Sequence, residues 1–344
     1  MKVGMYYNNS DVRLEEMPVP DIGNNDILIK VKASGICGSD VMEWYRIKRA
    51  PLVLGHEVTG EVIKVGLDVD KFKPGDRIFT LHHVPCEECP ECLKGHQTAC
   101  RDFQSINNFE PGAFSEYLKV TGKSVDTGTL KLPDNISYEE GTFIEPLGTV
   151  LRGLRATGIK PGDSILVIGA GLSGLLFIKA AKALGAGLIM ATDMQENRLE
   201  AAKRFGADYT ALAGEDIPST LEGVNDGRLA DRVILTTGAM PAVEQAMDSV
   251  ERGGTLLFFA VPRPEDKVEV DFNRYWRNDI TLKTSYGSAP IDHYQAIELM
   301  SSGRIEVKDM ITHRLPLEQI ASGFQMAAEG KDCLKVIIEP GSQD

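Results

Sequence analysis

A glycine-rich run between a buried strand and a helix constrains this chain more than any other feature. Residues 164–168 are continuously apolar, apart from the leading serine, as in a strand buried on both faces. They lead into Gly169-Ala170-Gly171-Leu172-Ser173-Gly174, and the helix that follows is expected to end near Leu184. The next strand, residues 188–192, is followed by Asp193, 19 residues past the last glycine. This spacing predicts a dinucleotide-binding βαβ unit.

The expected contacts of this unit define the cofactor. Gly169, Gly171 and Gly174 would let the backbone approach a pyrophosphate, which Leu172 and the first amides of the following helix would bind. Asp193 would accept hydrogen bonds from the adenosine ribose hydroxyls and repel a 2′-phosphate, so the sequence predicts NAD rather than NADP.

Arg198, several residues into the following helix, could neutralise a phosphate, or it could be a solvated residue on the adenine side.

Strands and helices continue to alternate after this unit, through apolar strands at 232–236, 255–260 and 280–286. Parallel strands joined by helices form a doubly wound sheet, which holds its ligands at the carboxyl ends of the strands. The turn after the first of these strands contains Thr237, which is a candidate for the nicotinamide side or part of a plain connecting loop.

The first part of the chain has a different pattern. Residues 1–125 read as short extended segments broken by Gly, Pro, Asn and Asp, and residues 27–32 alternate apolar and polar positions. This predicts an irregular β-barrel. A helix is expected at 142–158, and Lys160-Pro161-Gly162-Asp163 follows it as a boundary. With 344 residues, two domains are expected.

Two helical patterns occur after residue 288. One has an apolar stripe through Ile291, Tyr294 and Ile297, and the other has a stripe through Leu317, Ile320 and Phe324. Both stripes are interpreted as core faces.

The composition excludes several classes of partner. A formal net charge of −13 and the lack of clustered Lys and Arg argue against nucleic acid and anionic membranes. The longest apolar runs are of strand length, and no apolar signal segment follows Met1, so a cytosolic location is expected. There, the six cysteines would be reduced thiols available to metal.

Separated residues could bind a catalytic metal ion. Cys37, His56 and Glu145 could supply three ligands and leave one position open, as catalytic zinc requires. Glu57 follows His56 directly and is a second candidate carboxylate.

Four cysteines define a second candidate site. Cys86, Cys89, Cys92 and Cys100 have the spacing C-x2-C-x2-C-x7-C in a loop with too few apolar residues to form a core. Four thiolates can close a tetrahedron around one ion. Two disulfides, four idle thiols and an iron–sulfur cluster are the alternatives.

Together, these motifs resemble the zinc-dependent medium-chain dehydrogenase/reductase family, on its sorbitol, butanediol and threonine dehydrogenase side. The resemblance rests on Cys37-Gly38-Ser39-Asp40, Gly55-His56-Glu57-Val58-Thr59-Gly60 with Gly66, the four cysteines, Glu145-Pro146-Leu147 and the glycine run, in the family's order.

The resemblance implies an α/β protein with two domains. A chaperonin-10-like (GroES-like) β-barrel catalytic domain would span 1–150 and 288–344, with a structural zinc lobe at 86–100. A Rossmann domain that binds NAD would span 151–287. Lys335 would lie near the cofactor phosphates, although a surface lysine is the alternative from sequence alone. A homodimer or homotetramer is implied, often joined through cofactor-domain strands such as 256–260.

The resemblance also implies roles around the catalytic zinc. Ser39 would carry the substrate proton towards the cofactor ribose, and Asp40 would orient the imidazole of His56. A helix cap ahead of residues 41–44 is the alternative role for Ser39 and Asp40. Many relatives place a proton-relaying histidine where this chain has Met42, so Glu43 or a water chain could replace it. Either Glu57 or Glu145 would contact the ion directly.

The implied activity is NAD-dependent oxidation of a secondary alcohol in a polyol, sugar alcohol, cyclitol or similar molecule. The alternatives are a threonine-type or simple alcohol dehydrogenase and, in another class, a non-catalytic NAD(H)-binding protein. Residues expected to line the substrate pocket are Trp44, Phe109, Phe114 and Tyr286. The histidines without a motif are expected to be surface or core residues: His82, His83, His96, His293 and His313.

Overall fold

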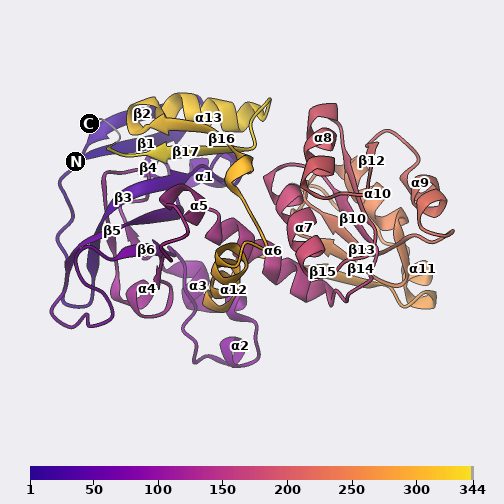
Figure 1. The fold of residues 1–344 in the computed structure, drawn as a ribbon, viewed down its shortest axis with the longest axis horizontal. Helices are drawn as coiled ribbons and strands as arrows, with labels where there is room; N and C mark the ends of the chain where they lie inside the picture. Colours follow the sequence, from indigo (N-terminus) through magenta and orange to yellow (C-terminus); the bar gives the residue numbers. More distant parts are fainter. Residues whose placement is uncertain (342–344) are drawn as a thin grey trace. The chain divides into compact units, whose positions relative to one another are not determined.

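The computed structural model describes residues 1–341. The chain divides into two compact units, which are described separately. The first contains Met1–Gly148 and the chain from Ser288 onwards, and the second contains Thr149–Gly287. Figure 1 shows the path of the chain through both.

The first unit is built mainly of strands. They are β1 (Lys2–Asn8), β2 (Asp11–Glu16), β3 (Ile27–Gly35), β4 (Leu52–Val53), β5 (Glu57–Val65), β6 (Arg77–Thr80), β7 (Phe109–Glu110), β8 (Tyr117–Val120), β9 (Leu130–Lys131), β16 (Ile311–Pro316) and β17 (Lys335–Glu339).

Its helices are mostly short. They are α1 (Glu43–Arg46), α2 (Pro90–Leu93), α3 (Arg101–Ser105), α4 (Gly122–Thr127), α5 (Tyr138–Gly141), α6 (Ile144–Thr157), which runs on into the second unit, α12 (Pro290–Ser301) and α13 (Ile320–Glu329), with 3₁₀ turns η1 (Ile47–Arg49), η2 (Gln97–Ala99), η3 (Lys308–Met310) and η4 (Leu317–Gln319).

These strands form one large sheet and one small sheet. The large sheet has the order β16-β17-β3-β5-β6-β9, with β8 also on β3 and β7 on β8, and the small sheet has the order β2-β1-β4. The C-terminal strand β17 pairs with β3, which lies some 300 residues earlier in the chain. Figure 1 shows the C-terminal elements α13 and β17 beside the N-terminal strands β1 and β2. The tail is therefore part of the first unit's core.

One of the two predicted helix faces is wrong. Leu317, Ile320 and Phe324 are buried, as the sequence predicted. On α12, however, Ile291 and Tyr294 are 49% and 54% exposed, and the buried face consists of Asp292, His293, Ala296, Ile297 and Met300. Two polar residues take core positions here because they have partners: Asp292 accepts the Ala289 amide, and His293 lies 2.8 Å from the Ser288 hydroxyl.

The second unit is a parallel sheet with helices. Its strands are β10 (Ile165–Ile168), β11 (Ile189–Asp193), β12 (Tyr209–Leu212), β13 (Ala230–Leu235), β14 (Val250–Phe258) and β15 (Thr281–Thr284). Its helices are α7 (Leu172–Ala183), α8 (Glu196–Phe205), α9 (Ile217–Val224), α10 (Met240–Asp248) and α11 (Phe272–Arg277).

The sheet order is β12-β11-β10-β13-β14-β15, with every neighbouring pair parallel. This is the Rossmann order, which confirms the predicted doubly wound fold. The strand order reverses between β10 and β13, so the carboxyl end of β10 is the expected ligand crevice. All four residues of β10 are buried, because helices cover the sheet, and α7 packs with α8 along it (Figure 1).

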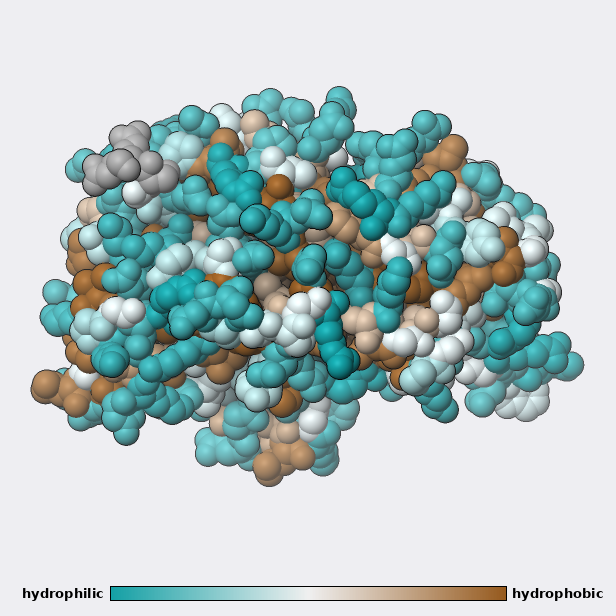
Figure 2. Space-filling model, viewed as in Figure 1, coloured by the Kyte–Doolittle hydropathy of each residue, from teal (hydrophilic) through white to brown (hydrophobic). Residues whose placement is uncertain are grey.

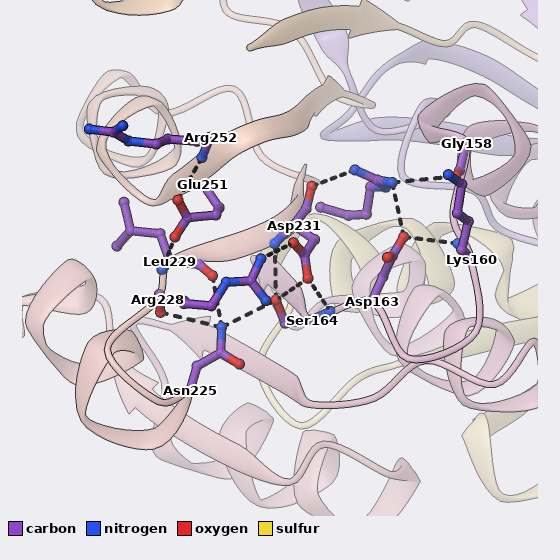
Figure 3. Close-up of polar contacts among 11 residues, drawn as sticks. Gly158, Lys160, Asp163, Ser164, Asn225, Arg228, Leu229, Asp231, Glu251 and Arg252 are labelled. Carbon is purple, nitrogen blue, oxygen red and sulfur yellow. Dashed lines mark hydrogen bonds and ion pairs between the residues drawn. The ribbon is translucent and has the colours of Figure 1, made fainter. Parts of the chain in front are cut away.

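The amino ends of the central strands are closed by a polar network (Figure 3). Asp231 accepts hydrogen bonds from the amide and hydroxyl of Ser164, at 2.9 and 2.8 Å, and pairs with Arg228 at 2.6 Å. Asn225 donates to the Ser164 hydroxyl and to the Leu229 carbonyl. These groups satisfy one another, so this end of the sheet contributes stability, whereas the opposite end is the one available to a ligand.

One face of the molecule is predominantly polar. Figure 2 shows a face covered mostly by hydrophilic residues, with hydrophobic residues scattered between them. Within residues 1–341, no helix is long and apolar enough to cross a bilayer.

Candidate active site and cofactor loop

Two paired strands bring three candidate metal ligands together. Cys37 lies just after β3, His56 just before β5, and Glu57 is the first residue of β5. The strands are antiparallel neighbours with Gly35 opposite Glu57, so the end of one strand meets the start of the other. Ligand atoms of Cys37, His56 and Glu57 all lie within 4.8 Å of one another.

Two glycines permit this approach. A Cβ on Gly35 would lie 2.3 Å from the Glu57 carboxylate and 2.6 Å from the Lys335 side chain. Gly55 has a φ of +96°, and a Cβ there would lie 2.8 Å from the Phe114 amide. Larger residues would push the donor groups apart.

A buried lysine holds the carboxylate of Glu57. Both side chains are fully buried, and Lys335 Nζ forms an ion pair with Glu57 Oε2 while also lying 3.4 Å from the Ile36 carbonyl. Glu57 Oε1 is buried without a hydrogen-bond partner in the described residues. An orphaned anionic oxygen beside a thiol and an imidazole suits zinc, so these residues fit the ion. The surface position expected for Lys335 from sequence alone is therefore wrong, because the side chain is buried and paired with Glu57 inside the first unit.

Glu145, at the start of α6, lies close enough for its charge to interact with His56 and Glu57. Burial, and secondarily the Glu57 carboxylate, raise the pKa of Glu145 to about 7. Among residues 1–341 it is not part of the compact donor group, which contains Glu57 instead.

Asp40 connects the loop after β3 to the imidazole. Its Oδ1 lies 3.4 Å from His56 Nδ1, and its Oδ2 accepts the Cys37 amide at 3.1 Å. Burial alone would lower the pKa of His56, but the adjacent Asp40 carboxylate and Cys37 thiol raise it well above its usual value. With Nδ1 facing Asp40, Nε2 is the nitrogen left for a metal.

The alternative role of Ser39 and Asp40 as a helix cap is not observed. The N-cap of α1 is Met42, and no side chain caps that helix. Instead, Ser39 accepts a hydrogen bond from Arg46, whose side chain returns to the loop from α1.

His82, which has no recognisable motif, lies at this site. Its ring centroid is 4.9 Å from that of His56 and 4.0 Å from that of His83. Burial, followed by the charge of His56, holds the pKa of His82 well below its usual value. The sequence signal that could have found it is its position just after β6, the strand that pairs with β5.

Phe114, expected in the substrate pocket, is wholly buried and contacts Phe324 in the core. Phe109 is also buried. Trp44 and Tyr286 are 40% and 56% exposed.

The four cysteines converge on one point. The Cys86–Cys92 and Cys89–Cys92 sulfur distances are 3.9 and 3.4 Å, and all four thiols form a compact group. Tetrahedral zinc with bonds of about 2.3 Å sets sulfurs about 3.8 Å apart, so the group fits this ion. Backbone amides of Cys86 and Cys89 point at the sulfurs of Cys100 and Cys86, as expected for thiolates. None of the four is in a disulfide.

The glycine run forms a tight turn at the carboxyl end of β10. Gly169 has a φ of +95°, and a Cβ on Gly174 would lie 1.9 Å from the Gly169 carbonyl oxygen. Gly171 is the N-cap of α7, and Leu172 is its first residue, so the first amides of a 12-residue helix open onto the turn. Thr236, which was not predicted as a site residue, donates to the Gly169 carbonyl, and Thr237 follows it.

Asp193 ends β11 beside this turn. Its carboxylate accepts the amides of Ala170 at 2.8 Å and Gln195 at 3.0 Å. Arg198 Nη1 lies 3.8 Å from Asp193 Oδ2, and a Cβ on Gly171 would lie 3.7 Å from the same nitrogen. Arg198 therefore lies at the glycine turn, together with Asp193.

Fold and site together define a two-domain dehydrogenase of the zinc type, and comparisons with known proteins agree. Residues 23–134 match the alcohol dehydrogenase GroES-like domain, and residues 174–302 match the zinc-binding dehydrogenase family. The chain is 34% identical to sorbitol dehydrogenase of Bacillus subtilis (strain 168) over 349 residues, covering 99% of this chain and 97% of that protein.

Solved structures of relatives agree as well. Galactitol-1-phosphate dehydrogenase from Escherichia coli has a TM-score of 0.88 at 29% identity, and the match covers 99% of this chain and 100% of that chain. 2R,3R-butanediol dehydrogenase from Bacillus subtilis has a TM-score of 0.86 at 28% identity, covering 99% of each chain. The chain belongs to the zinc-dependent medium-chain dehydrogenase/reductase family.

Proposed function

We propose that this protein oxidises a secondary alcohol group of a polyol or related hydroxylated molecule, passing a hydride to NAD and releasing a proton. The observation that carries the proposal is the compact donor group of Cys37, His56 and Glu57. A glycine turn shaped for a dinucleotide and relatives that act on sorbitol, galactitol 1-phosphate and butanediol support it.

Each residue at the donor group has a separate task. Zinc held there supplies a Lewis acid for the alcohol oxygen, and NAD supplies the hydride acceptor. Asp40 orients the imidazole of His56, and Lys335 balances the charge of Glu57 where neither is hydrated. Ser39 offers a hydroxyl next to the cysteine ligand. Glu145 is a second carboxylate that could bind the same ion.

The four cysteines are proposed to hold a second zinc ion. Their shell is complete, so this ion would stabilise the 86–100 lobe and have no part in the reaction.

NAD is the proposed cofactor because Asp193 is an acid at the end of β11, beside the turn of Gly169, Gly171 and Gly174. Arg198 opposes this preference, since its guanidinium could pair with a 2′-phosphate. The Asp193 carboxylate, 3.8 Å from it, already takes up part of that charge. We place Thr237 on the nicotinamide side of the same turn.

A cytosolic homodimer or homotetramer is proposed. Residues 256–260, expected to join subunits, lie largely on β14, which is internal in the sheet. β15 is the edge strand next to β14, and all four of its residues are exposed. An unpaired edge can extend its sheet into a second copy. Leu282→Asp, measured by light scattering against Lys283→Glu, should weaken such an assembly, and unchanged mass would count against this edge.

The decisive experiment is a substrate panel. Polyols, cyclitols, amino alcohols and simple alcohols are assayed for NADH formation, with zinc content measured on the same sample. A preference for a polyol with two zinc ions per chain supports the proposal. Preference for an amino alcohol would instead favour a threonine-type enzyme, and no turnover with full metal content would favour a non-catalytic NAD(H)-binding protein.

A further inference from the structure

An arginine is turned inward from an otherwise exposed segment beside the donor group. Between Met42 and Arg49 every residue is exposed except Arg46, whose side chain is 13% exposed. Met42, which directly precedes α1, is itself exposed. A charged side chain is rarely buried unless it has hydrogen-bond or ion-pair partners.

The partners of Arg46 are all in the loop that carries Cys37. Nε donates to the Ser39 carbonyl at 2.9 Å, and Nη2 donates to the Ser39 hydroxyl at 2.9 Å. The same Nη2 lies 3.4 Å from Asp40 Oδ1, the oxygen that faces His56 Nδ1. The Tyr45 ring lies against the guanidinium, 4.8 Å from its centre. One planar group thus connects the hydroxyl, the carboxylate and, through the carboxylate, the imidazole.

These contacts have two physical consequences. Because the Ser39 oxygen accepts from a cation, its own O–H is free to be donated to an anionic oxygen. Because Asp40 is fully buried, its charge needs compensation that His56, once a metal ligand, supplies only through a neutral N–H. A guanidinium does not release a proton in proteins, so Arg46 contributes charge and geometry and cannot relay protons as a histidine does.

We propose that Arg46 is a positioning residue of the active site, which fixes the Ser39 hydroxyl and the Asp40–His56 pair and provides a permanent positive charge beside them. This inference rests on the proposed dehydrogenase function for its catalytic consequence. The tether itself is independent of that function.

The test uses two variants and a matched control in the full-length protein. Arg46→Gln removes the charge, and Arg46→Lys keeps the charge but loses the planar guanidinium that donates from two nitrogens. Arg49→Gln removes an exposed arginine that contacts no carboxylate among residues 1–341. Thermal melting first shows that each variant is folded. The measurements are kcat and KM on the best alcohol of the panel, and the visible spectrum after cobalt(II) replaces zinc at the donor group alone.

We expect Arg46→Gln to lower kcat about 10- to 100-fold, the usual scale for residues that orient metal ligands, with KM changed less than about 3-fold. Arg46→Lys should recover part of kcat, and Arg49→Gln should match the wild type. The cobalt bands should shift in Arg46→Gln and stay unchanged in Arg49→Gln, because the orientation of His56 depends on Asp40.

Several results would overturn the inference. A wild-type kcat in Arg46→Gln would do so, as would a rise confined to KM, which would make Arg46 a substrate-binding residue. Equal losses in Gln and Lys variants with an unshifted cobalt spectrum would reduce it to a structural role. If the wild type oxidises no alcohol, the proposed function fails, and the spectrum alone then decides whether Arg46 tethers the site.

Discussion

The two candidate metal sites of the first unit are built in opposite ways. The cysteine lobe draws four identical ligands from one stretch of 15 residues, Cys86 to Cys100, with short helices and little apolar packing around it. The donor group of Cys37, His56 and Glu57 joins two strands of a large sheet, and its carboxylate is paired with Lys335 on a third. The cysteine lobe has little packing of its own to hold its ligands in place. The ligands of the donor group are held in place by the strands around them.

This difference indicates what each ion would do. A loop that cannot pack a core depends on its metal to stay folded. A site whose groups are already positioned by paired strands needs its metal for chemistry. Removing a ligand should therefore affect stability at the lobe and turnover at the donor group.

The largest effect is expected from Cys37→Ser. Loss of a thiolate ligand should empty or distort the donor group, so turnover should fall by more than about 100-fold, the scale of losing one group that stabilises transition-state charge. NADH binding, measured by fluorescence, should persist because the glycine turn belongs to the second unit. Retained activity would mean that the zinc mechanism is wrong.

Cys89→Ser should produce the converse result. One zinc ion should be lost and Tm should fall by at least about 5 °C, because the lobe unfolds locally. The folded protein should keep its turnover at low temperature. Cys333→Ser is the control, since Cys333 lies outside both donor groups. A Tm equal to that of the control would remove the contrast between the two sites.

Asp193→Ala tests a residue outside both sites. Losing a charge-assisted hydrogen bond of about 1.5–3 kcal/mol should cost roughly 10- to 150-fold in NAD selectivity over NADP. Arg198, relieved of its carboxylate neighbour, should add to the shift. Zinc content should not change. The measurement is kcat/KM with both cofactors, and a wild type that prefers NADP would refute the role of Asp193.

The smallest effect is expected on the stability of the fold at low pH, where loss of metal has to be separated from protonation of the buried His293. Burial lowers the pKa of His293 from 6.5 to about 3. Below pH 6.5 His293 binds a proton in the unfolded chain but stays neutral in the folded protein. Its contribution to the free energy of unfolding is therefore fully present above pH 6.5 and is lost as the pH falls towards 3. The slope from this residue is about 1.4 kcal/mol per pH unit.

The comparison is urea unfolding of wild type and His293→Gln between pH 7 and 4.5. Metal loss is common to both proteins, so a shallower fall in the variant isolates His293. Parallel curves would show that its burial does not contribute to acid sensitivity.

Local patterns in the sequence were sufficient for several features. The Gly169 to Gly174 run, Asp193 and the apolar strands around them predicted the Rossmann sheet, because each strand and turn depends on neighbouring residues. The cysteine lobe could also be predicted from the sequence, since all its ligands lie within one segment. Cys37 and His56 were predicted from the sequence as ligands of one ion, and the pairing of β3 with β5 explains why they meet.

Other features depended on residues that meet only in the folded chain. The buried pairing of Lys335 with Glu57 joins β17 to β5, across nearly the whole chain. His82 at the donor group, the inward Arg46 and the polar core face of α12 were likewise not predicted. Spacing in the sequence reports which side chains share a strand or helix face. Whether a buried charge finds its partner is decided by long-range packing, because that partner comes from a distant element.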